Sequence, residues 1–293
     1  MKYFILITYI LFSTHSFSQN IEGYVYDTYH KPLPLANIVL LNKKGGGTYS
    51  NKKGYFNFNS LYKKKDSILI SSVGFQKKTI IISSLQEKDT IILKENITNI
   101  NEVFLNFKKI KYNKKIKLGP KKNGNISSAK LIGFNTTTHI KNTQNKKGKL
   151  KTITLFLKKS RKRTSWKAPV FVAKFNLKIY TYDSINDKPG KELLHSNLVV
   201  APKNKNGTLT INVSDLNLII PKNGVCIGIE YIDENNEYKK YDHIGPALRY
   251  TRSLNGKNTW SNYRNSGWKK SSEKFRGYYE NLMLKIEVLF PKK

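Results

Sequence analysis

The sequence predicts an all-β protein built from two β-sandwich domains. From Ile21 onward, short runs rich in β-branched and aromatic residues alternate with turn signals, and this period-two pattern is typical of strands with one buried face. No run has the spacing of a long amphipathic helix. A chain of 293 residues also suits two sandwiches better than one continuous core.

Residues 1–18 have the pattern of a secretory signal peptide. Lys2 precedes an apolar run from Tyr3 to Phe12, and the tripeptide SFS offers a cleavage site after Ser18. The run is shorter than the roughly 18 apolar residues that a membrane-spanning helix needs, and no later stretch is long and apolar enough. We therefore expect an exported protein with no transmembrane segment in the mature chain. An uncleaved anchor is the alternative.

Residues 19–105 are predicted to form the first sandwich. Alternate residues of the first strand, IEGYVYD, face opposite sides. The two prolines in KPLPLANIVL have no backbone N–H to donate to a neighbouring strand. The second strand is therefore expected to begin only at Ala36. The segment GGGTYSNKKGYFNF has the composition of a phosphate-binding loop but not its residue order. We interpret it as two short strands joined in a hairpin by a turn that ends at Gly54.

These segments, followed by DSILISSVGF, DTIILKE and INEVFL, resemble in order and spacing the carboxypeptidase regulatory-like domain. The resemblance implies a seven-stranded, transthyretin-like β-sandwich that carries no reaction of its own. It also implies a Gram-negative cell envelope, since such domains occur there in exported proteins and in front of outer-membrane receptors. The expected location is therefore the periplasm or the outer-membrane surface, with envelope glycans or an outer-membrane receptor as candidate partners.

Residues 106–128, NFKKIKYNKKIKLGPKKNGNISS, lose the alternation and gain charge, glycine and proline. We interpret them as a basic linker between the two domains. The alternative is an edge strand of the second domain, since lysines commonly protect sheet edges from mispairing.

Residues 129–293 are predicted to form the second sandwich. Apolar and polar residues alternate in five runs, as expected for strands that bury one face and expose the other. These runs are 153–157, 171–179, 209–213, 225–231 and 282–290. Their succession resembles galactose-binding-like domains, which implies a C-terminal jelly-roll β-sandwich and makes this domain the expected carrier of any ligand surface.

The chain is strongly basic, with a formal net charge of +34 from 53 Lys and Arg against 19 Asp and Glu. Such a surface attracts polyanions such as lipopolysaccharide, anionic polysaccharide or nucleic acid, and export makes nucleic acid the least expected of these. The predicted polyanion contact is the densest basic run: Lys158, Lys159, Arg161, Lys162 and Arg163. Lysines that are merely solvated are the alternative.

Catalytic motifs are missing from the sequence. After His30, His139, His195 and His243, neither the His-x-x-Glu pair of metallocarboxypeptidases nor the HExxH motif occurs. There is no Gly-x-Ser-x-Gly, and the single cysteine, Cys226, lies in an alternating strand where a buried thiol is the default. We therefore predict no enzymatic activity, with a hydrolase of unrecognised type as the alternative.

An aromatic segment near the C-terminus is the predicted ligand-binding site. Trp260, Tyr263 and Trp268, interleaved with Arg264, offer ring faces for sugars or bases and a cation for acidic groups. The alternative is that the two tryptophans fill the sandwich core.

The one acidic concentration, EYIDENNEYKKYD, is a candidate calcium site. Asp233, Asn235 and Glu237 stand at alternate positions and offer oxygen ligands. The glycine of an EF-hand loop is replaced by Tyr238, so a solvated turn is the alternative and no other cofactor is predicted. The sequence as a whole predicts a non-catalytic exported binding or structural module of the cell envelope. Carbohydrate or anionic-glycan binding through the jelly roll is the alternative.

Overall fold

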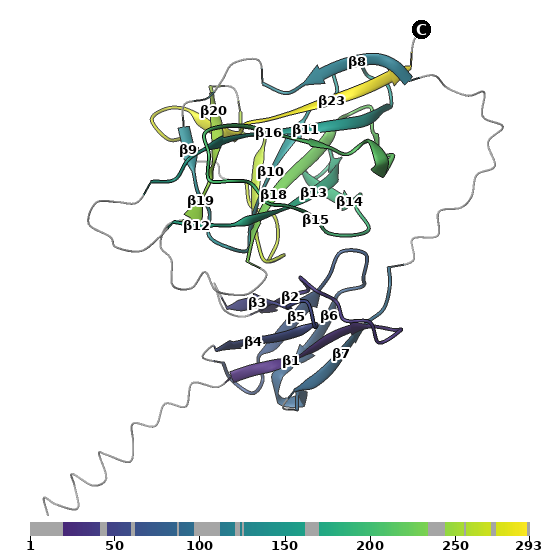
Figure 1. The fold of residues 1–293 in the computed structure, drawn as a ribbon, viewed down its shortest axis with the longest axis vertical. Coiled ribbons are helices and arrows are strands. Elements are labelled where there is room, and N and C mark those ends of the chain that lie inside the picture. Colours follow the sequence, from purple (N-terminus) through teal and green to yellow (C-terminus); the bar gives the residue numbers. More distant parts are fainter. Residues whose placement is uncertain are drawn as a thin grey trace, which may run out of the picture. The chain divides into compact units, whose positions relative to one another are not determined.

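The computed structural model (Figure 1) describes residues 20–41, 46–59, 62–86, 88–96, 112–120, 124, 126–161, 170–233, 244–254, 256–270 and 274–291. The predicted signal peptide, residues 1–18, lies outside this part. Regular structure in the described residues is β-strand apart from two short 3₁₀ turns, so the predicted all-β class is confirmed. None of the helices in the described part is long and apolar enough to cross a membrane.

The chain divides into two compact units. The first comprises Met1–Ser71 and Lys77–Lys94, and the second comprises Ser72–Gln76 and Glu95–Lys293. Each unit contains its own sheets, so each is described by itself.

The first unit holds its described strands in two sheets. The three-stranded sheet has the order β4-β1-β7, and the four-stranded sheet has the order β3-β2-β5-β6. The elements are β1 (Asn20–Asp27), β2 (Asn37–Leu40), β3 (Gly47–Tyr49), β4 (Tyr55–Asn59), β5 (Ser67–Ser71), β6 (Lys78–Ile81), the 3₁₀ turn η1 (Ile82–Ser84) and β7 (Asp89–Leu93). These seven described strands agree with the number that the resemblance implies.

Burial along β1 alternates residue by residue, which confirms the expected two faces of this strand. Val25, Ile38, Ile68 and Ile70 are fully buried and form the centre of the first unit's core. Their β-branched side chains suit a pleated surface that packs against a second sheet.

The glycine-rich segment crosses between the two sheets. The predicted turn is present, and Gly54 has a φ of +74°, with its amide donating to the carbonyl of Asn51 at 2.9 Å. A Cβ on Gly54 would lie 2.6 Å from the carbonyl oxygen of Val25, so only glycine fits. The predicted hairpin is wrong, however, because β3 pairs with β2 while β4 pairs with β1. The turn joins the two layers of the sandwich.

The larger sheet of the second unit has eight strands. Its main order is β22-β20-β11-β23-β8, with β16 and β17 also pairing β11 and β9 pairing β20. The strands are β8 (Tyr112–Leu118), β9 (Ile126–Ser128), β11 (Gly148–Lys158), β16 (Gly207–Asn212), β17 (Ile219–Ile220), β20 (Ala247–Ser253), β22 (Tyr279–Leu282) and β23 (Leu284–Pro291), with the 3₁₀ turn η2 (Ser214–Leu216) between β16 and β17.

The other large sheet of the second unit has six strands. Its main order is β14-β13-β18-β10-β21, and β15 pairs with β13. The strands are β10 (Phe134–Ile140), β13 (Lys174–Asp183), β14 (Lys188–Glu192), β15 (Leu198–Val200), β18 (Val225–Ile232) and β21 (Thr259–Tyr263), and the short β12 (Phe171–Val172) and β19 (Ile244–Gly245) pair separately.

The two large sheets bury their facing sides against each other, and Figure 1 shows them as two layers. Leu155 of β11 and Ile286 of β23 are 1% exposed, and Leu177 of β13 and Ile227 of β18 are completely buried. The predicted alternation of buried and exposed positions is confirmed for β11 and β23. For β13 and β18 it is wrong, because consecutive residues on both faces of these two strands are buried. It follows that polar positions on β11 and β23 lie on the outer side of the eight-stranded sheet.

The predicted linker needs correction. Residues 112–118 form β8, which pairs with β23 at the edge of the eight-stranded sheet, and residues 126–128 form β9. The edge-strand alternative therefore describes these residues. The many lysines of β8 suggest a loop in the sequence. An edge strand can nevertheless carry lysines and keep its hydrogen bonds to the neighbouring strand.

Candidate functional site

A polar pocket opens at one end of the six-stranded sheet. Its volume is about 650 Å³, and it is lined by His139, Lys141, Asn142, Thr143, Asn145, Tyr182, Lys222 and Asn223. These residues come from the end of β10 and its following loop, from the end of β13 and from the turn before β18. They converge because β13, β18 and β10 are consecutive neighbours in the sheet.

An aromatic stack forms one wall of this pocket. The rings of His139 and Tyr182 have centroids 3.9 Å apart and planes inclined by 15°. His139 Nε2 lies 2.8 Å from the carbonyl oxygen of Asn223, and a carbonyl only accepts, so Nε2 carries the proton and Nδ1 is left as an acceptor. Burial lowers the pKa of His139, although the bond to Asn223 opposes the shift. The ring is therefore neutral at neutral pH.

The loop after β10 is fixed from inside by Asn142. The side chain of this buried residue donates to the carbonyl oxygens of Lys146 at 2.7 Å and Pro221 at 2.9 Å. Its own oxygen accepts from the amide of Gln144 at 3.0 Å. Asn142 thus has a structural role and holds the exposed side chains of its neighbours around the opening.

The turn before β18 depends on glycine. Gly224 has a φ of +101°, and a Cβ there would lie 2.2 Å from the carbonyl oxygen of Ile140. Only a residue without a side chain lets this turn approach β10 so closely. The approach places Lys222 and Asn223 in the lining of the pocket, next to the loop after β10, to which the turn is hydrogen-bonded through Asn142.

Tyr182 is held in place by Asp187, in the turn between β13 and β14. The tyrosine hydroxyl donates to Asp187 Oδ1 at 2.9 Å, Lys270 donates to Oδ2, and Trp260 Nε1 donates to the Asp187 backbone carbonyl at 2.9 Å. Burial alone would raise the pKa of Asp187, but the bonds from Lys270 and Tyr182 hold it below its usual value. Asp187 therefore stays ionised and orients the stacked ring.

The predicted aromatic platform is not an exposed surface. Trp260 is 2% exposed and Arg264 is 1% exposed, whereas Tyr263 and Trp268 are half-buried. Trp260 lies on β21 opposite Thr137, on the face of the six-stranded sheet that also carries Tyr180 and Tyr182 and points away from the other large sheet. The Trp268 ring meets Tyr180 edge-on at 5.2 Å. The alternative, in which the two tryptophans fill the sandwich core, is right about the burial of Trp260 but not about its place. The indole is buried on the outer side of the six-stranded sheet, against Asp187 and Lys270, and a buried indole cannot stack on a ligand.

The other predicted residues are dispersed. Lys158 ends β11, and Lys158, Lys159 and Arg161 are exposed, while Lys162 and Arg163 lie outside the described residues. Asp233 is 5% exposed directly after β18, and Asn235 and Glu237 also lie outside the described part. Within the described ranges there is no group of three or more His, Cys, Asp and Glu side chains that could hold a metal ion.

No motif in the sequence predicts the His139–Tyr182 stack. The two residues are 43 positions apart and meet only because β10 and β13 both pair with β18. His139 is opposite Cys226 in one pairing and Tyr180 is opposite Cys226 in the other. Because both strands pair with β18 at Cys226, the carboxyl ends of β10 and β13 lie at the same end of the sheet.

The family comparison concerns the N-terminal part of the chain. A family model of the CarboxypepD_reg-like domain matches residues 21–105, which supports the resemblance based on the N-terminal segments. No curated protein matches the chain.

One solved structure with a likeness to the chain is "The crystal structure of the cysteine protease and lectin-like domains of Cwp84, a surface layer associated protein of Clostridium difficile". It has 13% sequence identity and a TM-score of 0.34. The likeness covers 53% of this chain and 32% of that one, so the chain spans about a third of that structure's length.

Proposed function

We propose that the second unit is a non-catalytic saccharide-binding module of an exported protein, and that its ligand enters the pocket beside the His139–Tyr182 stack. One observation carries the proposal. A stacked aromatic pair stands at an opening of about 650 Å³ whose other lining groups are amides, a hydroxyl and two lysines. That volume lies within the about 300–1,000 Å³ typical of small-molecule sites.

The lining suits the chemistry of a sugar. Sugar C–H faces pack against aromatic rings, and sugar hydroxyls both donate and accept hydrogen bonds. The side chains of Asn145 and Asn223 offer both partners, and His139 Nδ1 adds an acceptor. Lys141 and Lys222 place two positive charges at the opening, so a saccharide that carries a carboxylate or sulfate is favoured.

The first unit has an accessory role in this proposal. The match of residues 21–105 to the CarboxypepD_reg-like domain supports a sandwich without chemistry of its own. The predicted signal peptide supports a location in the cell envelope.

A glycan array with neutral and acidic saccharides, probed with the full chain at about 150 mM salt, tests the proposal. His139→Phe keeps a ring to stack on Tyr182 but removes both ring nitrogens. We expect it to weaken the best array ligand by about tenfold, the equivalent of one hydrogen bond. The matched control is His195→Phe, at an exposed histidine outside the pocket, which should bind as the unsubstituted chain does.

A second pair of variants tests the preference for acidic sugars. Lys141→Gln with Lys222→Gln should bring the affinity for an acidic saccharide down to that for its neutral analogue. The exposed pair Lys203→Gln with Lys205→Gln changes the net charge equally and should leave the preference intact. If the unsubstituted chain retains no glycan, or if His139→Phe and His195→Phe retain it equally, the pocket is not a saccharide site.

A further inference from the structure

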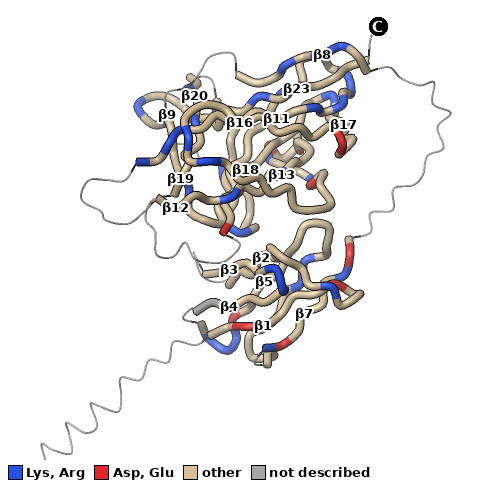
Figure 2. The backbone as a smooth tube through the Cα atoms, in the orientation of Figure 1, with Lys and Arg blue, Asp and Glu red and all other residues tan. Residues whose placement is uncertain are grey.

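A second basic surface lies on the outer side of the eight-stranded sheet. The neighbouring strands β11, β23 and β8 together carry seven lysines and one acidic residue. Figure 2 shows the blue basic segments along these strands. This concentration belongs to the opposite sheet from the pocket and draws on none of the pocket's residues.

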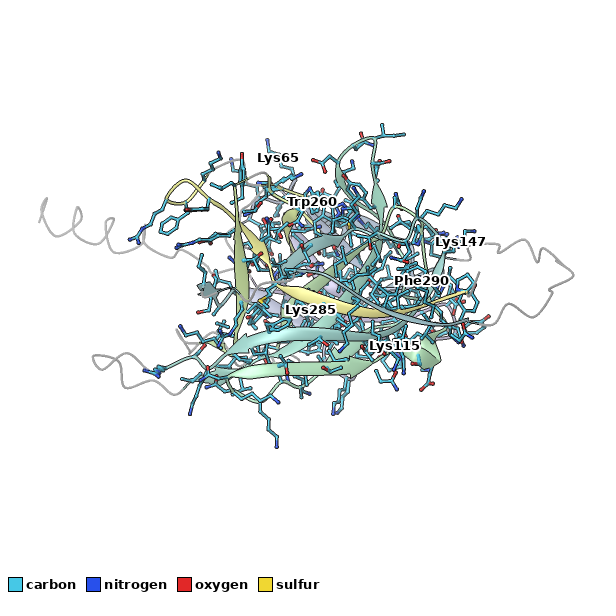
Figure 3. All side chains as sticks on the ribbon, turned by 90° about the horizontal axis from the view of Figure 1, so that it is seen from above. Lys65, Lys115, Lys147, Trp260, Lys285 and Phe290 are labelled. Carbon is cyan, nitrogen blue, oxygen red and sulfur yellow. The ribbon has the colours of Figure 1, made fainter. Side chains whose placement is uncertain are left out.

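Strand register places five of these lysines on one face, which we call the lysine face: Lys115, Lys117, Lys149, Lys151 and Lys285, together with Glu287. Apolar residues at the intervening positions, such as Leu150, Ile286 and Val288, are buried, so the lysines point to the outer side. Lys115 and Lys285 are labelled in Figure 3, which views the molecule from above.

A register shift places a threonine hydroxyl on the lysine face beside the cations. The pairing of β11 with β23 slips between Leu150 and Thr152, which is the irregularity that a β-bulge produces. Lys151 therefore points outward together with Thr152, and its ammonium lies 3.6 Å from Glu287. Without the shift, strict alternation would place Lys151 and Lys149 outward and Thr152 inward, leaving no hydroxyl beside the carboxylate.

One carboxylate serves two of the lysines. Oε1 of Glu287 lies 3.8 Å from Lys115 Nζ and 3.6 Å from Lys151 Nζ, and Lys117 is directly opposite Glu287 in the ladder. Five lysines and one glutamate leave the face with four uncompensated positive charges. Strands are about 4.8 Å apart, so lysines on adjacent strands lie within about one screening length of each other at physiological salt.

The uncharged residues of the same face are suited to a sugar polymer. Thr154 and Thr210 share a hydrogen bond of 3.0 Å between their hydroxyls, and Phe156 lies beneath the ammonium of Lys285, 5.5 Å from its ring centroid. β11 alone has 11 residues and extends for about 35 Å at about 3.4 Å per residue. The face is thus long and basic, and carries hydroxyl groups beside its charges.

We propose that the lysine face binds a linear acidic polysaccharide, with the carboxylates of successive uronate residues lying over the lysines. Like charges placed side by side on a sheet oppose folding, and an anionic chain would remove that repulsion. Nucleic acid fits less well, because none of the three strands carries arginine for bidentate phosphate contacts. Phe156, with Lys285 over its ring, also offers no free face for a base.

Titration of the full chain with polygalacturonate at about 150 mM salt tests this proposal, with dextran as the neutral polymer. The triple variant Lys115→Gln, Lys117→Gln and Lys285→Gln should lose at least about tenfold in affinity. The matched control replaces the exposed lysines Lys63, Lys64 and Lys65 of the first unit with glutamine. It has the same net charge as the triple variant and should change affinity less than about twofold.

Glu287→Gln provides a test with the opposite sign. It removes the one acid of the face, so affinity for polygalacturonate should rise by roughly threefold. Thermal unfolding of each variant without ligand shows whether the fold is retained. If both triple variants lose the same affinity for polygalacturonate, binding depends on net charge and not on the lysine face, and the proposal is wrong. If double-stranded DNA binds as tightly as polygalacturonate, the ligand is not specifically a polysaccharide.

The outcome is separable from that for the pocket. His139→Phe should leave polygalacturonate binding to the lysine face unchanged, and the lysine triple variant should leave retention of a short saccharide by the pocket unchanged. Failure of one proposal therefore leaves the other standing.

Discussion

Replacing Trp260 distinguishes a core residue from a ligand-binding residue. The indole is 2% exposed, and a buried tryptophan covers about 200 Å² of surface. At about 25 cal/mol per Å², this burial is worth at most about 5 kcal/mol. Trp260→Ala should therefore destabilise the second unit by about 3–5 kcal/mol. Trp260→Phe keeps most of the buried ring but loses the bond from Nε1 to Asp187, and should cost about 1–2 kcal/mol.

The measurement is equilibrium urea unfolding followed by circular dichroism. The two units should be fitted as separate transitions, since a multidomain chain is not expected to unfold in one step. Trp268→Ala is the matched control, because Trp268 is half-buried and should cost less than Trp260→Ala. The reasoning is refuted if Trp260→Ala unfolds at the same urea concentration as the unsubstituted chain and loses saccharide binding. That pair of results would make Trp260 an exposed contact.

Three further predictions concern single residues of the second unit. Burial, with a smaller contribution from the charge of Asp187, raises the pKa of the Cys226 thiol to about 12. A thiol reagent should therefore label Cys226 only after the chain unfolds, and labelling of the native chain would contradict this. The lowered pKa of His139 means that the unfolded chain binds its proton more readily, so the free energy of unfolding should fall as pH drops through about 6.5. This slope should be reduced in His139→Phe, and an unchanged slope would assign it to other groups. Gly224→Ala should destabilise the chain by about 2 kcal/mol or more in urea unfolding, and by more than Gly207→Ala, which also has positive φ but has open space around it.

The pocket and the lysine face suggest how one unit could hold a single long glycan. They lie on different sheets and use different contacts, so a polymer that reached both would gain from effective concentration. A short saccharide would occupy the pocket alone. Comparing short and long acidic glycans of the same repeat would measure this gain directly.

The sequence was a good guide to the strands and a weaker guide to their partners. Alternation along IEGYVYD and along 153–157 predicted buried and exposed faces that the structure confirms. The glycine-rich turn was also predicted, yet its two strands were assigned to one hairpin and belong to different sheets. Period-two patterning states which side of a strand is buried but not which strand lies beside it.

The candidate site shows the same division. The aromatic segment is a candidate site in the sequence because its tryptophans and arginine are close together there, but Trp260 and Arg264 are buried. The residues that line the pocket come from the ends of β10 and β13, the loop after β10 and the turn before β18, and no local motif links them. Sequence proximity favours local clusters, whereas a pocket in a β-sandwich is made by loops that the sheet order brings together.

The all-β class, the basic charge and the resemblance of the N-terminal segments can be read from the amino-acid sequence, because they depend on composition and local periodicity. The edge position of β8, the burial of Trp260 and the contact of His139 with Tyr182 appear only in the folded chain. Each of these depends on long-range pairing, such as that of β10 and β13 with β18. The physical reason is that hydrogen-bonded ladders select partners through register and packing over the whole unit.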